Sequence, residues 1–192
     1  MEKSPGKKNI AVFISGRGSN LNSLINYSKT KKSLIRIVLV ISDKYSAKGL
    51  VYANKSKINN IFIKYNNRSN FENRLLKLLN KSNIELVCLA GFMKIFSGNF
   101  IRSFCKPILN IHPSLLPKYK GLNTQQRAIK NKEKFSGATV HIVNQKLDSG
   151  KIILQKKVKI LKSESGKSLE KKILKIEHEI YPKAIIRLLT RY

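Results

Sequence analysis

Two polar side chains that can do chemistry lie close together in the middle of the chain, at Asn110 and His112. Histidine and aspartate are scarce here, with three and two copies among 192 residues. Asn110 and His112 are two residues apart after an apolar run, so on a β-strand they would share one face. A carboxamide and an imidazole on one face supply a hydrogen-bond donor and a proton-exchanging group. The spacing also fits a polar strand end with a capping histidine, and both interpretations stay open at this point.

Asp148 is the second aspartate of the chain and lies in the sequence Leu-Asp-Ser-Gly, residues 147–150. This composition is frequent in turns. A carboxylate close to a histidine would raise the pKa of the imidazole and stabilise its charged form. Asp148 is therefore either a turn residue or an acidic partner for one of the histidines.

Residues 16–20, GRGSN, separate an apolar segment from one with helical spacing. Glycines let the backbone approach a ligand closely, and backbone N–H groups at a helix start attract phosphate. Leu21 stands where a dinucleotide fingerprint would have its third glycine, and no Gly-Lys-Ser/Thr follows. The loop fits the phosphate of one mononucleotide, or else a plain strand–helix turn capped by Ser19 or Asn20.

The elements that must position these residues alternate between strand and helix. Strands are predicted for residues 9–15, 34–42, 60–64, 84–90 and 107–111, with helices for residues 21–30, 50–57 and 70–80 between them. After residue 120 we predict a helix for 124–130, two neighbouring strands for 137–144 and 151–160, and a helix for 168–180 that Pro182 bends or breaks. The pattern predicts an α/β, Rossmann-like open sheet, twisted and mostly parallel, with helices on both faces and antiparallel strands added near the C-terminus. We expect a single domain over residues 1–192, with residues 1–8 as a flexible N-terminal extension.

The formal net charge of +29 is typical of proteins that bind nucleic acid. The charge comes from 31 lysines and 8 arginines scattered along the chain, without interleaved aromatic residues for base stacking. Both a solvated surface and an electrostatic role with RNA or anionic substrates fit this charge. No apolar run is long enough to span a membrane, and no signal peptide is apparent. Cys88 and Cys105 are expected to be buried thiols of a cytoplasmic protein.

Several motifs together resemble a known enzyme family. Residues 110–121 (NIHPSLLPKYKG), 137–141 (GATVH) and 147–150 (LDSG) resemble the formyltransferases that use 10-formyltetrahydrofolate. Residues 14–21 (ISGRGSNL) and 177–182 (EHEIYP) narrow this to the phosphoribosylglycinamide formyltransferases, with similarity over residues 9–190. The resemblance implies transfer of the formyl group of 10-formyltetrahydrofolate to the amino group of N1-(5-phosphoribosyl)glycinamide in de novo purine biosynthesis. It implies small-molecule substrates, no metal, no obligate nucleic acid, no membrane, and a cytoplasmic monomer or weak homodimer.

The resemblance also implies roles for individual residues. Asn110 and protonated His112 would stabilise the negative oxygen of a tetrahedral intermediate, a type of contact worth about 3–4 kcal/mol. Asp148 would raise the pKa of His112 and orient it, and water or His112 would carry the amine proton to the leaving nitrogen. The residues implied in ribonucleotide binding are Gly18, Ser19, Asn20 and Glu177. The residues implied in folate binding are Arg68, Met93, Lys94, Ile95, Phe96, Asn110, Asn144, Gln145, Lys146, Leu147 and Asp148.

The chain also departs from the family pattern. Asn123 and Gln125 stand where the family commonly has histidines, and Lys120 stands where proline is usual, which predicts a looser loop. His141 is expected to be structural or to support the catalytic residues from behind, and His178 is expected to be structural. The alternatives are a methionyl-tRNA formyltransferase, a formyltetrahydrofolate hydrolase, or a non-catalytic RNA-binding protein that uses the +29 charge. We expect the first two to carry an additional domain.

Overall fold

The structure is a computed structural model that describes residues 6–190 of the chain. Its internal contacts divide the chain into two compact units, Met1–Leu109 and Asn110–Tyr192. The division falls inside strand β5 (Ile108–His112), which contributes residues to both units. Strand β1 (Lys8–Ile14) begins inside the predicted N-terminal extension, and residues 1–5 of that extension lie outside the described residues.

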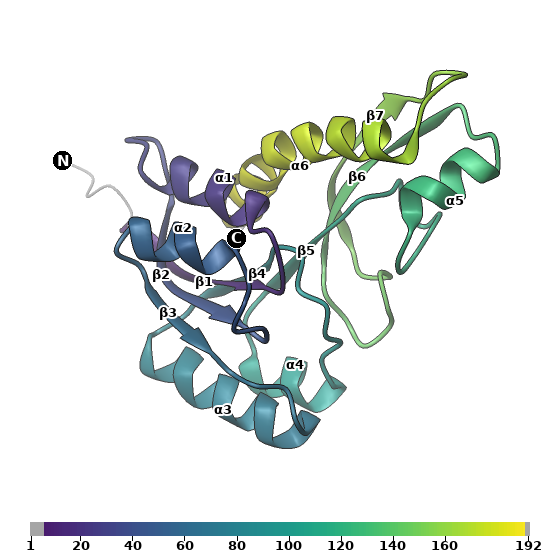
Figure 1. Cartoon of the computed structure of the whole chain (residues 1–192). Coiled ribbons are helices and arrows are strands. Elements are labelled where there is room, and N and C mark those ends of the chain that lie inside the picture. The colour runs from purple at the N-terminus through teal and green to yellow at the C-terminus, as the bar shows by residue number, and fades with distance from the viewer. Residues whose placement is uncertain (1–5, 191–192) are drawn as a thin grey trace. The chain divides into compact units, whose positions relative to one another are not determined.

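The first unit is a parallel sheet with helices on both faces. Its remaining strands are β2 (Ile35–Ser42), β3 (Asn59–Phe62) and β4 (Leu86–Leu89). Its helices are α1 (Ser19–Ser28), α2 (Gly49–Lys55), α3 (Arg68–Lys81) and α4 (Gly98–Phe104). The strand order is β3-β2-β1-β4-β5, and β1 pairs in parallel with both β2 and β4. Helices α1 and α2 cover one face and α3 and α4 the other (Figure 1).

The apolar strands of the first unit are buried because helices cover both sides of the sheet. Residues 10–14 of β1 have no exposed surface. On α3, the buried residues Phe71, Leu75 and Leu79 follow the four-residue spacing of one helix face. This arrangement confirms the predicted parallel α/β sheet and directs the carboxyl ends of its strands to one edge.

The second unit adds the antiparallel part of the fold. Strands β6 (Phe135–Ile142) and β7 (Ile152–Lys159) pair antiparallel, as predicted, and the order continues β5-β6-β7. Helix α5 (Thr124–Lys130) precedes β6, and helix α6 (Gly166–Leu189) packs against β6 and β7. The prediction that α6 stops near residue 180 was too short, because the helix continues through Pro182. Buried Tyr181, Ala184, Ile185 and Leu188 extend its apolar face beyond the proline.

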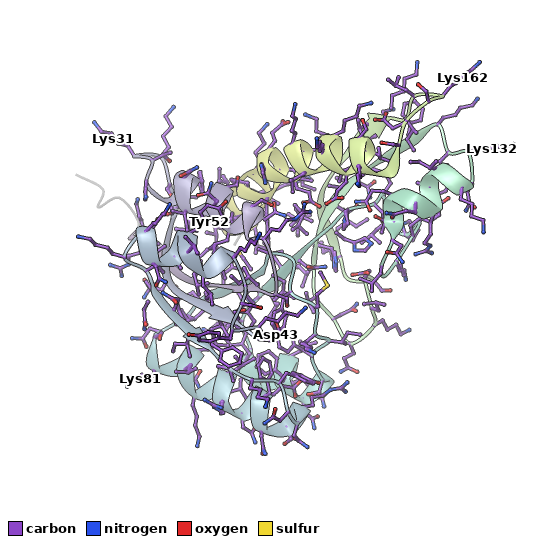
Figure 2. All side chains as sticks on the ribbon, in the orientation of Figure 1. Lys31, Asp43, Tyr52, Lys81, Lys132 and Lys162 are labelled. Atoms are coloured by element: carbon purple, nitrogen blue, oxygen red, sulfur yellow. The ribbon has the colours of Figure 1, made fainter. Side chains whose placement is uncertain are left out.

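The exposure of the lysine side chains and the burial of the cysteines can be compared with what the composition predicted. Figure 2 shows Lys31, Lys81, Lys132 and Lys162 at the surface, and each is exposed. These four cations come from four different segments of the chain, consistent with scattered surface charge.

Cys88 is buried, as predicted. The prediction for Cys105 was wrong, because the residue is exposed at the end of α4.

Candidate active site

The second unit brings together the three side chains that the sequence singles out for chemistry. Asn110 and His112 lie on β5, and Asp148 lies in the loop between β6 and β7. The Asn110 amide nitrogen lies 3.5 Å from Oδ1 of Asp148, and Nδ1 of His112 lies 3.4 Å from Oδ2. His112 and Asp148 are 6% and 8% exposed, so the pair is largely withdrawn from water. The two-residue spacing on the strand therefore places both side chains against one carboxylate.

The backbone holds Asp148 in an uncommon conformation. Its φ is 45°, in the left-handed region that aspartate tolerates better than most residues. The N–H of Gly121 donates to Oδ2 at 2.9 Å. Two residues after Asp148, a Cβ on Gly150 would lie 1.6 Å from the Ile142 carbonyl oxygen, so only glycine lets the loop return to β6 this closely. Asp148 is therefore both a turn residue and a carboxylate that faces a histidine, so its two interpretations from the sequence are compatible.

His141 on β6 contacts the cluster from the neighbouring strand, which agrees with the second of its two expected roles, support of the catalytic residues. Its Nδ1 lies 3.0 Å from the Ile142 carbonyl oxygen, which can only accept, so Nδ1 carries the proton. Its Nε2 lies 3.2 Å from the Asn110 amide nitrogen and 3.6 Å from Oδ1 of Asp148. With the proton on Nδ1, Nε2 can accept one amide hydrogen of Asn110, and the other amide hydrogen points toward Asp148.

His112 faces a hydrogen-bond acceptor at each ring nitrogen. Its Nε2 lies 2.9 Å from the carbonyl oxygen of Tyr119, and its Nδ1 faces Asp148. Because the Tyr119 carbonyl can only accept, Nε2 keeps a proton whether the ring is neutral or charged. A change of protonation state at His112 therefore takes place at Nδ1, next to the carboxylate.

The pKa of His112 lies below its ordinary value. Burial lowers this pKa most, while the Tyr119 carbonyl and the Asp148 carboxylate raise it. The charges of His141 and Arg127 lower it further. The predicted direction of the Asp148 effect is confirmed, but loss of water around the ring outweighs it. His112 is thus mostly neutral at pH 7, in contrast to the expectation that it is held charged.

The pKa of Asp148 is also lowered. Burial alone would raise it, but the contact with His141, the N–H of Gly121 and the electrostatic effect of the nearby His112 and His141 rings together lower it. Asp148 is therefore ionised at neutral pH. The cluster combines an anion, a neutral imidazole that can take a proton beside it, and a carboxamide donor, which suits proton transfer and stabilisation of a developing charge.

The loop predicted to bind a phosphate lies in the first unit, between β1 and α1. Gly18 has φ 76° and is the N-cap of α1, and no side chain caps that helix. The alternative of a turn capped by Ser19 or Asn20 is therefore not what the structure contains. A Cβ on Gly18 would lie 2.3 Å from the Cα of Gly49, which keeps this loop close against α2. Ser19 is half-buried and Asn20 is buried.

The segment predicted to bind folate follows β4 and is fixed at both ends. The N–H of Met93 donates to Oγ of Ser15 at 2.9 Å. Ser97 donates to the buried Glu72 through its N–H at 2.7 Å and its hydroxyl at 2.6 Å. Met93 and Ile95 are 57% and 52% exposed, so two apolar side chains project from a segment that is anchored at both ends.

Phe96 differs from its neighbours in this segment. It is 4% exposed and stacks on Phe92 and Phe100, with ring centroids 5.6 and 4.4 Å away. Its ring belongs to the core of the first unit, so only its backbone is left for a ligand. Lys94 lies 4.4 Å above the ring of Tyr65 and 3.8 Å from Oδ2 of Asp43.

Asp43 was not assigned a role from the sequence. It follows β2 (Figure 2), and its side chain is 2% exposed. Its position directly after a buried strand could have indicated a binding role, because ligands in open α/β sheets bind beyond the carboxyl ends of strands. In the structure its carboxylate forms an ion pair with Lys94, and Lys94 belongs to the segment predicted to bind folate.

The other predicted residues lie in three separate places. Arg68 is the first residue of α3 and is exposed, with Nε 3.5 Å from the Tyr65 hydroxyl. Glu177 is buried on α6. The exposed residues before Asp148 in the β6–β7 loop are Asn144, Gln145, Lys146 and Leu147. Among the described residues, no group of three or more histidine, cysteine, aspartate or glutamate side chains could hold a metal ion. No helix in residues 6–190 is long and apolar enough to cross a membrane.

The chain is similar to known proteins over most of its length, including the site residues described above. The model of the formyl transferase family matches residues 8–185. A phosphoribosylglycinamide formyltransferase from Haemophilus influenzae is 42% identical over 181 residues, covering 93% of this chain and 85% of the relative. A trifunctional purine biosynthetic protein adenosine-3 from Bos taurus is 40% identical over 94% of this chain, which spans 18% of its length. The crystal structure of glycinamide ribonucleotide transformylase 1 from Symbiobacterium toebii is similar at TM-score 0.92 and 37% identity, over 96% of this chain and 89% of that chain.

Proposed function

Because the chain belongs to the formyl transferase family, we propose that it transfers the formyl group of 10-formyltetrahydrofolate to the amino group of N1-(5-phosphoribosyl)glycinamide, as in purine biosynthesis. The observation that carries this proposal is the meeting of Asn110, His112 and Asp148 within the second unit. Two of the similar proteins reported above are named as formyltransferases or transformylases of the glycinamide ribonucleotide, and the third is named for trifunctional purine biosynthesis. Those names favour the ribonucleotide over methionyl-tRNA as the acceptor.

The first task of the site is to stabilise the oxygen of the formyl group. When the amine attacks the formyl carbon, that oxygen gains negative charge, and fixed donors aimed at it lower the barrier. The Asn110 amide is such a donor, but its hydrogens face His141 at 3.2 Å and Asp148 at 3.5 Å. The contact with Asp148 is the longer and weaker one. A substrate oxygen would therefore replace Asp148 as the partner of that hydrogen.

The second task is to move a proton from the attacking amine to the leaving nitrogen. An α-amino group with a pKa near 7.7–8.0 is already partly neutral at pH 7, so attack needs little help. Neutral His112 can take the amine proton at Nδ1, directly or through water, because Nε2 is already occupied by its hydrogen bond to Tyr119. Asp148 then stabilises the imidazolium, and the charged ring can return the proton to the leaving nitrogen.

Residues in both units support the proposed contacts with the two substrates. The uncapped start of α1 offers backbone N–H groups to the phosphate of the ribonucleotide, with Gly18, Ser19 and Asn20 as its contacts. Buried Glu177 is proposed to accept ribose hydroxyls. Met93 and Ile95 offer apolar surface for the flat ring of the folate, and Arg68 offers a positive charge for its carboxylates. Residues 144–148 complete the proposed folate contacts.

We also retain the predictions that the protein is a single domain, works in the cytoplasm, and is a monomer or weak homodimer. The family match runs from residue 8 to residue 185, across both units, which supports one domain. Both cysteines are free, in keeping with a reducing compartment.

The experiment that tests the proposed function offers two acceptors in parallel. Purified protein is mixed with 10-formyltetrahydrofolate and either the ribonucleotide or methionyl-tRNA, and formylated product is measured. We expect transfer to the ribonucleotide alone. Transfer to methionyl-tRNA, or salt-dependent RNA retention without any transfer, would contradict the proposal and assign a role to the +29 charge instead.

A further inference from the structure

We propose that three side chains outside the catalytic cluster, those of Tyr119, Arg127 and Glu133, position His112 by holding residues 118–122 in place. We call these three residues the α5 brace, because they lie just before, within and just after α5. The inference rests on the proposed role of His112. Within the brace, Arg127 and Glu133 act as positioning residues, since each acts through the loop.

The loop matters because its backbone contacts both members of the His112–Asp148 pair. The carbonyl of Tyr119 accepts from Nε2 of His112 at 2.9 Å. Two residues later, the N–H of Gly121 donates to Oδ2 of Asp148 at 2.9 Å. One short stretch of backbone therefore fixes the ring orientation of the imidazole and the rotation of the carboxylate. A shift of this loop would move both groups together.

The loop does not adopt this shape from its own backbone preference. Tyr119 and Gly121 have φ values of 57° and 76°, and Asn123 directly after the loop has a φ of 57°, all in the left-handed region. Glycine adopts that region readily, whereas tyrosine does so at a cost in free energy. Contacts from outside the loop must therefore maintain its conformation.

The tyrosine end of the brace is a hydrogen-bonded network. The hydroxyl of Tyr119 donates to Oε1 of Glu133 at 2.9 Å and accepts from the Asn131 amide at 3.0 Å. Lys118 donates to the same Oε1 at 2.9 Å. The pKa of Glu133 is lowered by Lys118 and by Tyr119, so the acceptor stays charged at neutral pH. The carboxylate thus ties two consecutive loop residues to the segment after α5.

The arginine end of the brace acts on the backbone directly. One terminal nitrogen of Arg127 donates to the carbonyl of Lys120 at 2.6 Å and to that of Leu122 at 3.3 Å. The guanidinium also lies 5.2 Å from the centre of the Tyr119 ring. A planar guanidinium can bind two carbonyls and stack on an aromatic ring at once, whereas an ammonium is a compact point charge. Arg127 therefore fastens the loop on both sides of Gly121.

These contacts are not required for the cohesion of the fold. The loop carbonyls of Lys120 and Leu122 could bond to water, and the Lys118–Glu133 pair lies near the surface, where such pairs add little stability. Geometry at the catalytic pair is more demanding, since a displacement of about 1 Å can lower a rate by about 100-fold. The expected signature of the brace is therefore a change in turnover and pH dependence that exceeds any change in stability.

The test uses variants that leave the charges around His112 unchanged. The charged or titratable groups that face His112 are Asp148, His141 and Arg127. Tyr119→Phe keeps the backbone carbonyl and removes the hydroxyl, and Arg127→Lys keeps the positive charge and removes the fork. The matched control for Arg127→Lys is Arg102→Lys, an arginine bonded to one side chain. Glu179→Gln, which removes a carboxylate between two surface lysines, controls for the loss of a surface polar contact.

We expect each brace variant to lower kcat about 5- to 10-fold and the double variant more, with KM for both substrates within about twofold. Weakening the Tyr119 carbonyl contact should also move the His112 limb of the pH–rate profile toward lower pH, because that contact raises the pKa of the ring. The controls should match the parent. Unchanged kcat and pH profile in both brace variants, with loss of thermal stability alone, would overturn the proposal.

The same assay separates this inference from the proposed function. If His112→Ala is inactive and the brace variants match the parent, the brace proposal fails and the function stands. If His112→Ala retains turnover, the catalytic role of His112 fails, and the brace has no catalytic group to position.

Discussion

The Nδ1 atom of His112 lies 3.4 Å from Oδ2 of Asp148, and both side chains are about 7% exposed. Charge attraction and burial oppose each other in this pair. Burial lowers the pKa of the imidazole more than the carboxylate raises it. The pair therefore rests as a neutral ring beside an anion, ready to take up one proton during the reaction.

Replacing Asp148 with asparagine should abolish most turnover. The variant keeps the shape of the side chain and removes the charge that stabilises protonated His112. We expect kcat to fall about 100-fold or more, the usual contribution of positioned acid–base groups. Stopped-flow or steady-state assays at pH 7.5 measure this, with circular dichroism to verify folding. A folded variant within threefold of the parent would refute the role of Asp148.

Removing the amide of Asn110 should remove a donor to the developing oxyanion. For Asn110→Ala we expect a loss of about 100- to 1000-fold in kcat, with KM much less affected, because the contact strengthens in the transition state. The variant also releases Nε2 of His141 from its 3.2 Å contact. A variant that raises KM and leaves kcat unchanged would show that Asn110 only binds substrate.

Stability should fall as pH falls from 7.5 to 5.5. The pKa values of buried His112 and half-buried His178 are lowered in the folded protein, so the unfolded chain takes up protons near pH 6.5 that the folded chain does not. Each such proton can contribute up to about 1.4 kcal/mol per pH unit. The pKa of Asp148 is lowered as well, and its contribution is lost only below about pH 4.

Urea unfolding of the parent and of His112→Asn at both pH values measures this effect. The variant should show a shallower loss of unfolding free energy on acidification. Equal slopes for the two proteins, or a parent more stable at pH 5.5 than at pH 7.5, would contradict the assignment of a neutral buried ring.

Gly18 should tolerate substitution far less well than Gly16. A Cβ at Gly18 meets the Gly49 backbone at 2.3 Å and forces a positive φ on alanine, whereas a Cβ at Gly16 has no neighbour within 4 Å. We expect Gly18→Ala to cost more than about 1 kcal/mol of unfolding free energy and to weaken ribonucleotide binding. Gly16→Ala serves as the matched control in denaturation and binding titrations. Equal stability of the two variants would exclude the tight contact between this loop and α2.

The exposed residues of the segment after β4 should affect folate binding and not stability. Ile95 is 52% exposed, so Ile95→Ser removes apolar surface without opening a cavity. We expect KM for 10-formyltetrahydrofolate to rise about 5- to 10-fold, the value of one or two methylene contacts. KM for the ribonucleotide and the melting temperature should stay at the parent values. A parallel rise in both KM values would argue against a folate contact.

The elements that the sequence predicted well are those with strong hydrophobic patterns. The apolar runs in β1, β2 and β4 and the spacing of α3 gave their type and order directly. The two-residue spacing of Asn110 and His112 predicted their shared face. Pro182 led to the one clear error in an element boundary, because proline in a helix is usually disruptive while tertiary burial around Tyr181 and Ile185 outweighs it here.

Other features depend on contacts between segments distant in sequence. The cluster includes His141 because β6 pairs next to β5, which no local pattern indicates. The pKa of His112 is lowered mainly because the fold excludes water from around the ring. A sequence motif indicates the neighbouring charge of Asp148 but not this burial. The bonds from Arg127 to the carbonyls of Lys120 and Leu122 depend on the folded shape of this loop, which the spacing of the residues does not predict.

The most direct test of the account is the turnover of His112→Ala at saturating concentrations of both substrates. We expect kcat to fall at least about 100-fold while the unfolding midpoint at pH 7.5 and the binding of each substrate stay close to the parent values. A folded His112→Ala variant that transfers the formyl group at a rate near that of the parent would contradict it.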